Sequence, residues 1–200
     1  PVGLAFEGIR QDVPVEEIQG DGFQLCWSGR YNANAELDEV LGGCNEGELL
    51  LGCRPVGSPN LTLAATGERA EVLTDLGREQ NGVHSHNGVD WYFSDNYSMG
   101  FVAQGTGVNR TSCDTANVQP ELRMCWHTRD RRITSGYRCG QNFLNGNAGW
   151  ERVVFHRAPL SITVCSALPG EPAGDEVCNG LDDDCDGVSD EDVNCGPAGP

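Results

Sequence analysis

The sequence predicts a mainly β (β-rich α+β) protein: a disulfide-stapled, β-sandwich-like domain with one short helix, followed by a small Asp-rich C-terminal module. Three observations support this prediction. Short apolar or alternating segments, bounded by Gly, Asn and Pro, recur along most of the chain. Ten cysteines are spread along it, and acidic residues concentrate at its C-terminal end. Two hundred residues are enough for one good core and a small appendix.

We expect residues 1–20 to form an extended N-terminal arm, in which apolar side chains lead into Val13-Pro14-Val15. Pro14 lacks a backbone N–H, so this segment is predicted to be an edge strand or a docked arm rather than a central strand. Such an arm can dock on its own domain, or it can add as a strand to the sheet edge of another copy.

One helix is predicted over residues 34–42, where Asn34 can cap the first turn and Gly42-Gly43 end the last. The remaining periodic segments alternate as strands do. We predict strands within residues 22–27, 49–51, 61–63, 89–93, 99–103, 122–126, 150–155 and 160–164.

The pattern also predicts domain boundaries. Residues 21–168 should form the β-rich domain, and 169–174 a short linker stiffened by proline. Residues 175–200 should form the C-terminal module and tail.

Pro1 is not an initiator Met, which we interpret as the removal or omission of a signal peptide.

The cysteines indicate an oxidising compartment. They are even in number and no Cys-x-x-Cys pair occurs, which disfavours zinc ribbons and redox motifs and favours disulfides in a secreted or cell-surface protein. The predicted disulfide cysteines are Cys26, Cys44, Cys53, Cys113, Cys125, Cys139, Cys165, Cys178, Cys185 and Cys195.

The charge of the chain limits the classes of partner that it can be expected to bind. The net charge is −17, every basic residue is Arg, and ten acidic residues lie between Glu171 and the C-terminus with no basic residue among them. The other twenty acids face thirteen arginines, so residues 1–170 carry a net charge of about −7. An acidic chain without a basic stripe argues against nucleic acid and anionic membranes, and no apolar run is long enough to insert in a bilayer.

The acidic C-terminal segment predicts a Ca²⁺ site. Seven carboxylates lie between Asp182 and Asp192 and would repel one another without a cation. Asp182, Asp184, Asp186 and Gly187 have the Asp-x-Asp-x-Asp-Gly spacing of an EF-hand loop. Val193, however, occupies the twelfth position, where an EF-hand has its bidentate Glu. The predicted ligands are Asp182, Asp184, Asp186, the Val188 carbonyl, Asp190 and Glu191.

The stretch Cys-Asn-Gly-x-Asp-Asp-Asp-Cys-Asp-Gly-x-x-Asp-Glu, within residues 177–191, resembles the metal-binding repeat of the MopE type. It is also similar to thrombospondin type 3 calcium repeats. The resemblance implies an exported bacterial protein with this motif appended to another domain. Residues 4–157 look similar to an uncharacterised group of secreted proteins, on the segments 50–58, 91–94, 123–128, 136–140 and 150–152. That likeness implies a secreted setting and no particular activity.

Two further clusters are candidate sites. One segment, residues 91–97, combines aromatic residues with Asp and Asn. Aromatic faces stack on sugars while Asp and Asn side chains form directed hydrogen bonds, so this segment is a candidate ligand surface. The competing interpretation places Trp91 and Phe93 in the core and residues 94–96 in a turn. The candidate surface comprises Trp91, Tyr92, Asp95, Asn96 and Tyr97.

The second cluster is His84-Ser85-His86, whose imidazoles would share one face of a strand. His127 or His156 could join them at a copper or zinc site; two polar residues in a loop are the simpler interpretation. Three acceptor sequons begin at Asn60, Asn96 and Asn109.

Two function classes remain. The first is an extracellular calcium-binding structural or adhesive surface protein, which includes a self-assembling subunit of a filament or sheath. It would associate with itself as a homopolymer, or bind a cell-surface or glycan partner. The alternative is a secreted carbohydrate-binding, lectin-like module. An enzyme is not expected, because no Gly-x-Ser-x-Gly elbow, P-loop or His-Glu-x-x-His motif occurs.

Overall fold

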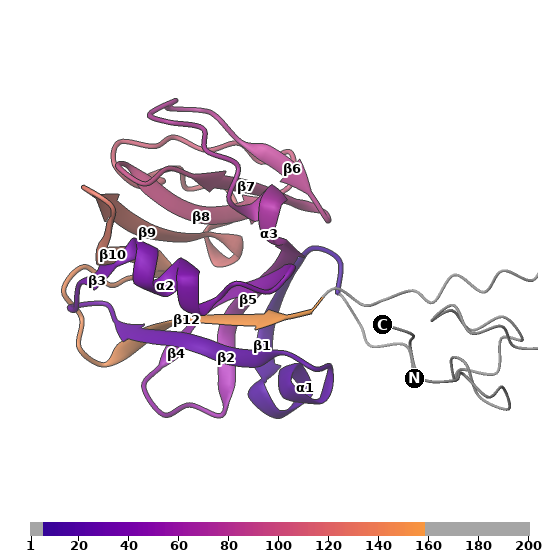
Figure 1. The fold of residues 1–200 in the computed structure, drawn as a ribbon. Coiled ribbons are helices and arrows are strands. Elements are labelled where there is room, and N and C mark those ends of the chain that lie inside the picture. Colours follow the sequence, from indigo (N-terminus) through magenta and orange to yellow (C-terminus); the bar gives the residue numbers. More distant parts are fainter. Residues whose placement is uncertain (1–5, 159–200) are drawn as a thin grey trace, which may run out of the picture. The chain divides into compact units, whose positions relative to one another are not determined.

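The computed structural model describes residues 6–158, which fold into two antiparallel sheets (Figure 1). The first sheet has the order β1 (Ile9–Pro14), β5 (Asn60–Glu68), β4 (Glu48–Pro55), β12 (Trp150–Arg157), β2 (Gln24–Arg30). The second has the order β11 (Asn142–Phe143), β10 (Arg132–Cys139), β9 (Met124–Arg129), β8 (Ser98–Ala103), β7 (Val89–Phe93), β6 (His84–His86), and β3 (Ala35–Glu36) also pairs with β10.

Short helices connect the strands of these sheets. They are α1 (Val15–Gly20), α2 (Leu37–Gly43), α3 (Arg69–Val72) and a single 3₁₀ turn, η1 (Pro120–Leu122). None of the helices in the described part of the chain is long and apolar enough to cross a membrane.

Apolar side chains from both sheets form the main core. Leu49 and Leu51 of β4 pack there with Trp91 of β7 and Trp126 of β9. Leu50, between them in sequence, points to the opposite face of the first sheet, where it packs with Ile18 of α1. The continuous Leu49-Leu50-Leu51 run is therefore explained by a central strand that is buried on both faces.

The structure confirms a mainly β fold, and the predicted strands near β2, β4, β5, β7, β8, β9 and β12 are present. β1 is an edge strand, as Pro14 requires, and it pairs with β5 of the same chain. The arm prediction is wrong for residues 15–20, which form α1 and bury Ile18. Because β1 pairs with β5, residues 9–14 are already part of a sheet of their own domain and are not a free strand that could add to another copy.

The predicted helix exists, but it starts at Leu37 rather than Asn34. Glu36 stands at its N-cap without a side-chain cap, and residues 35–36 pair with β10 instead. The prediction of one helix also missed α1 and α3, because four to six residues are too short to show a helical period.

Three disulfides join cysteines within residues 6–158: Cys26–Cys44, Cys53–Cys139 and Cys113–Cys125. Cys53 lies on β4 and Cys139 on β10, so this bond links the two sheets covalently. The other four predicted disulfide cysteines, Cys165, Cys178, Cys185 and Cys195, lie outside the described residues.

Buried arginines hold the connecting segments against the sheets. Arg152 of β12 donates through Nη2 to the carbonyls of Arg30 and Ala33, at 2.7 Å each, and through Nη1 to the carbonyl of Thr134. Its guanidinium carbon lies 5.5 Å from the ring centroids of both Trp27 and Tyr31. Burial lowers the pKa of Arg152 to about 10, so the group is still charged at neutral pH.

Candidate ligand-binding cleft

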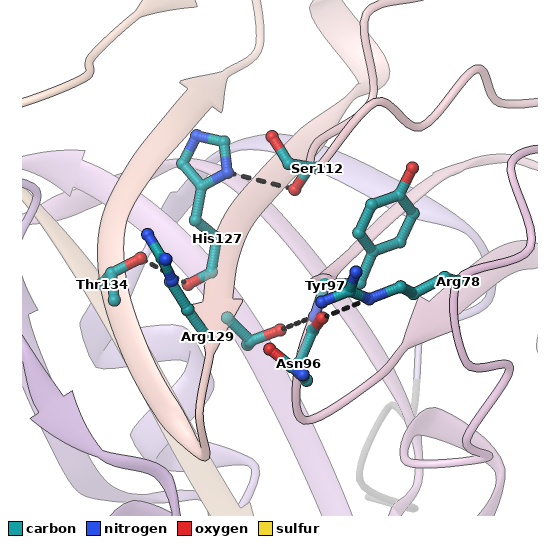
Figure 2. A pocket seen from close by; sticks show the side chains of 8 residues that line it. Arg78, Asn96, Tyr97, Ser112, His127, Arg129 and Thr134 are labelled. Atoms are coloured by element: carbon teal, nitrogen blue, oxygen red, sulfur yellow. Dashed lines mark hydrogen bonds between the residues drawn. The ribbon is translucent and has the colours of Figure 1, made fainter.

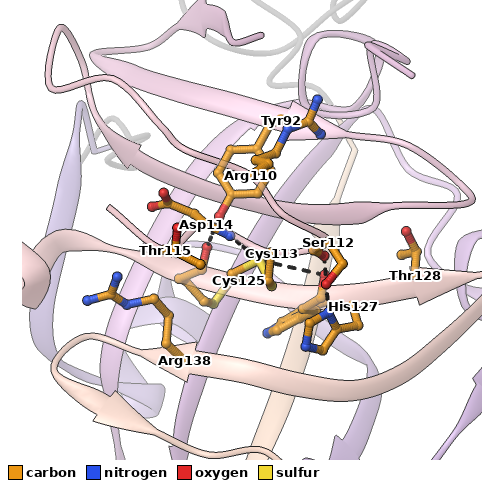
Figure 3. Close-up of a disulfide and its surroundings, with 12 residues drawn as sticks. Tyr92, Arg110, Ser112, Cys113, Asp114, Thr115, Cys125, His127, Thr128 and Arg138 are labelled. Carbon is orange, nitrogen blue, oxygen red and sulfur yellow. Dashed lines mark hydrogen bonds between the residues drawn. A yellow bond between two sulfur atoms is a disulfide. The ribbon is translucent and has the colours of Figure 1, made fainter. Parts of the chain in front are cut away.

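The outer face of the second sheet is covered at one end by the segment between β8 and η1. Val108 and Cys113 of that segment pack on Tyr92 of β7 and Cys125 of β9. The Cys113–Cys125 disulfide fixes this cover to the sheet (Figure 3). Tyr92 Oη donates to the Met124 carbonyl at 2.7 Å, and burial raises the pKa of Tyr92 well above its usual value.

Beside the covered part, the same face carries an open cleft of about 380 Å³ (Figure 2). It lies over β9 and β10, where they meet the turn between β7 and β8. All of its lining side chains are polar or aromatic, and no carboxylate is among them. The lining residues are Arg78, Asn96, Tyr97, Ser112, His127, Thr128, Arg129 and Thr134.

Thr128 of β9 fixes the β7–β8 turn at one wall of the cleft. Its Oγ1 donates to the Ser94 carbonyl at 2.5 Å and accepts from the Tyr97 backbone N–H at 3.0 Å. The Asn96 side-chain oxygen accepts from the backbone N–H of Asp130 at 3.2 Å. The turn is therefore tied to β9 and to the β9–β10 turn at several points, which gives the cleft a rigid wall.

His127 and Ser112 form another wall. His127 Nδ1 lies 3.0 Å from the backbone carbonyl oxygen of Ser112 (Figure 2). Because a carbonyl oxygen only accepts, we assign the proton of the neutral ring to Nδ1. Nε2 is then the unprotonated ring nitrogen, which can accept a hydrogen bond. Ser112 has a φ of 82°, a conformation uncommon for a non-glycine residue, next to the disulfide at Cys113.

Arg110 contacts the segments that carry two lining residues, Arg78 and Tyr97. It is fully buried and donates to the carbonyls of Glu79 and Gly77, which holds the segment that carries Arg78. Its guanidinium carbon lies 5.2 Å from the Tyr97 ring centroid, and its own carbonyl accepts from Tyr97 Oη at 2.7 Å. Burial lowers the pKa of Arg110.

The predicted ligand surface is only partly placed at this cleft. Asn96 and Tyr97 line it, but Trp91 and Tyr92 do not, which corrects the prediction. Both of these side chains are about 1% exposed, and Trp91 Nε1 donates to the His86 carbonyl inside the domain. Strand alternation cannot distinguish them from surface residues, because β7 is buried on both faces. Asp95 lies in the same turn and its carboxylate pairs with Arg131 at 3.0 Å.

His84 and His86 lie on β6, as the strand interpretation expects, but each has its own partner. His84 Nε2 contacts the Glu71 carboxylate, and His86 Nε2 accepts from the Glu68 backbone N–H at 3.2 Å. His156 instead accepts from the Glu46 N–H, and His127 lines the cleft. Within residues 6–158, no cluster of three or more His, Cys, Asp or Glu side chains is placed to hold a metal.

A second open cleft of similar volume lies near β1, η1 and the β10–β11 connection. It contains two carboxylates, Asp12 and Glu121, and one of them is already engaged, since Asn60 Nδ2 donates to Asp12 Oδ1 at 2.8 Å. Its remaining lining residues are Gln11, Thr62, Gly140, Gln141 and Asn142.

The predicted calcium ligands, Asp182, Asp184, Asp186, Val188, Asp190 and Glu191, lie outside the described residues. Several residues of the cleft carry no recognisable sequence signal: Arg78, Ser112, Arg129 and Thr134 come from separate segments without a motif. The chain matches no protein-family model, no curated protein and no solved structure.

Proposed function

We propose that this chain is an extracellular adhesive surface protein whose β domain binds a carbohydrate through the cleft over β9 and β10. The observation that carries the proposal is the lining of that cleft, which combines the Tyr97 ring with donors that make no hydrogen bond within residues 6–158: the Asn96 side-chain NH₂ and the terminal nitrogens of Arg78. Sugars offer both hydroxyl groups and apolar C–H faces, so a site of this composition suits them.

Rigidity favours binding. The Tyr97 hydroxyl and the Thr128 hydroxyl are both used to fix the walls, so the cleft does not have to be ordered when a ligand arrives. Support for binding rather than catalysis comes from His127, whose Nδ1 is directed at the Ser112 carbonyl and not at its hydroxyl.

The proposed setting is the cell exterior. Three disulfides within the described domain are consistent with an oxidising compartment. We also propose that the Asp-rich loop at residues 182–191 binds Ca²⁺, on the strength of its clustered carboxylates and its resemblance to secreted calcium repeats.

Self-association is the second candidate, and one observation favours it. β2 lies at the edge of the first sheet and pairs only with β12 among the described strands. Leu25 on β2 is 45% exposed, so this edge presents an apolar side chain beside its unpaired backbone groups. A second copy could add to this edge. Sizing of native material by light scattering and electron microscopy distinguishes a regular polymer from a monomer.

A glycan array probed with the full-length protein tests the proposed function. We expect at least one oligosaccharide to bind, and Asn96→Ala to weaken that binding about tenfold, because the amide supplies a directed hydrogen bond. Asn45→Ala is the matched control, since Asn45 is exposed and does not line the cleft. Circular dichroism confirms that both variants remain folded. A protein that binds no glycan, or binds equally well with Asn96→Ala, contradicts the proposal.

A further inference from the structure

The cleft over β9 and β10 has an unbalanced set of free polar groups. Arg78 uses only its Nε, which donates to the Asn96 carbonyl at 3.2 Å, so its terminal nitrogens make no hydrogen bond within residues 6–158. The Arg129 guanidinium makes no hydrogen bond within residues 6–158, and its one ion pair there, with Asp130, is a loose contact at 3.8 Å. Two guanidinium groups therefore line the cleft with most of their donors unused.

The neutral groups of the lining include both donors and acceptors. The Asn96 side-chain oxygen is already occupied by the Asp130 N–H, which leaves its amide NH₂ as a donor. The hydroxyls of Thr128 and Thr134 donate to the carbonyls of Ser94 and His127. These two hydroxyls have no proton left for a ligand and, like Nε2 of His127, can only accept, so the excess of free donors comes from the two guanidinium groups and the Asn96 amide.

The charges around the cleft point the same way. No carboxylate lines it, although the chain as a whole carries a net charge of −17. Asp95, which adjoins Asn96, is paired with Arg131 at 3.0 Å, and Arg131 also binds Asp38. Asp130 is about 79% exposed beside Arg129, so solvent screens that pair. The cleft is thus a local cationic site on an acidic protein.

From this imbalance we infer that the ligand is an acidic saccharide, whose carboxylate or sulfate group is held by Arg78 and Arg129. This inference rests on the proposed function, and it adds the class of sugar. A planar guanidinium matches the two oxygens of a carboxylate, or two oxygens of a sulfate, through paired N–H donors. The Tyr97 ring, whose centroid lies 6.0 Å from the Arg78 guanidinium carbon, and the Asn96 amide then contact the sugar ring.

Binding of the full-length protein to three defined probes tests this inference. The probes are oligogalacturonate, its methyl ester, and a sulfated galactan oligosaccharide; the ester keeps the uronide backbone but removes the charge. We expect oligogalacturonate, the sulfated probe or both to bind, and the ester to bind at least tenfold more weakly than oligogalacturonate wherever the latter binds. Raising the ionic strength should weaken the interaction.

Arginine variants assign the site. Arg78→Gln and Arg129→Gln should each weaken binding about tenfold, because each removes charged donors and keeps a similar chain length. Arg132→Gln is the control, since Arg132 is an exposed arginine on β10 that pairs with Glu36 and does not line the cleft.

The outcomes separate the two proposals. Equal binding of the ester and the acid, with a loss in Asn96→Ala, overturns the acidic class and leaves carbohydrate binding in place. Binding of the acidic probes that is unchanged in both arginine variants also overturns the inference, because it places the anion elsewhere. Failure of both acidic probes overturns it as well, whereas carbohydrate binding through the cleft is contradicted by a negative glycan array or by glycan binding that Asn96→Ala leaves unchanged.

Discussion

At the scale of single residues, the arginines divide into a buried group and an exposed group, and the buried group has a structural role. Five of the thirteen arginines are buried, and they donate mainly to backbone carbonyls rather than to carboxylates. Arg138, for example, donates to the carbonyls of Gly140, Ala116 and Pro120. The guanidinium fork can reach several carbonyls at once, which a lysine ammonium cannot do with the same geometry. This role gives a physical reason for a chain whose basic residues are all arginine.

Arg152 allows this role to be tested. Arg152→Lys keeps the charge but cannot reach the carbonyls of Gly29, Arg30, Ala33 and Thr134 together, so several buried carbonyls lose their donor. We expect the free energy of unfolding to fall by about 3 kcal/mol, measured by urea denaturation. Arg132→Lys, at an exposed site, should change it by less than about 0.5 kcal/mol. Equal effects at the two sites would show that charge alone matters.

At the scale of elements, the disulfides differ in what they join. Cys53–Cys139 links β4 of one sheet to β10 of the other and closes a separation of 86 residues. Cys113–Cys125 closes only 12 residues and holds the cover segment on β9, close to His127 of the cleft. A longer loop constrains the unfolded chain more strongly, so the first bond should contribute more to global stability.

We therefore expect the double variant Cys53→Ala/Cys139→Ala to lose about 4.5 kcal/mol of unfolding free energy, against about 3 kcal/mol for Cys113→Ala/Cys125→Ala. The second variant should nevertheless lose more ligand affinity, because Ser112, which lines the cleft, is the residue before Cys113 in the sequence. Chemical denaturation and glycan binding measured on the same samples provide both comparisons. If the two bonds contribute equally to stability, loop length is not the controlling variable here.

The strands also show which parts of the fold can be predicted from the sequence and which cannot. β7 and β8 are predictable because strong apolar segments flank a Ser-Asp-Asn turn. β10 is not, because its alternation is interrupted by Gly136, where an added Cβ would lie 2.1 Å from the Tyr31 ring. That glycine reflects a contact across more than a hundred residues. The cleft is unpredictable for the same reason: pairing of β9 with β8 and β10 joins segments that share no motif.

At the scale of the whole molecule, the chain combines a proposed cationic cleft with a proposed calcium loop. The lining of the cleft contains no carboxylate, the charged oxygen ligand that calcium sites use most. The proposed calcium ligands all lie in residues 182–191. The two activities should therefore be separable by chemistry that acts on only one of them.

Calcium removal is the corresponding experiment. Isothermal titration of the full chain with Ca²⁺ should show a dissociation constant on the order of 10⁻⁴–10⁻³ M, the range typical of extracellular calcium-binding modules, and Asp184→Asn/Asp186→Asn should abolish binding. Glu39→Gln removes an exposed carboxylate on α2 and should leave the titration unchanged. A chelator should empty the loop while oligosaccharide binding persists, since a cleft that uses guanidinium and amide donors needs no bridging cation. Loss of glycan binding on chelation would mean that the two sites are coupled, and calcium binding that survives the double variant would place the ion away from residues 182–191.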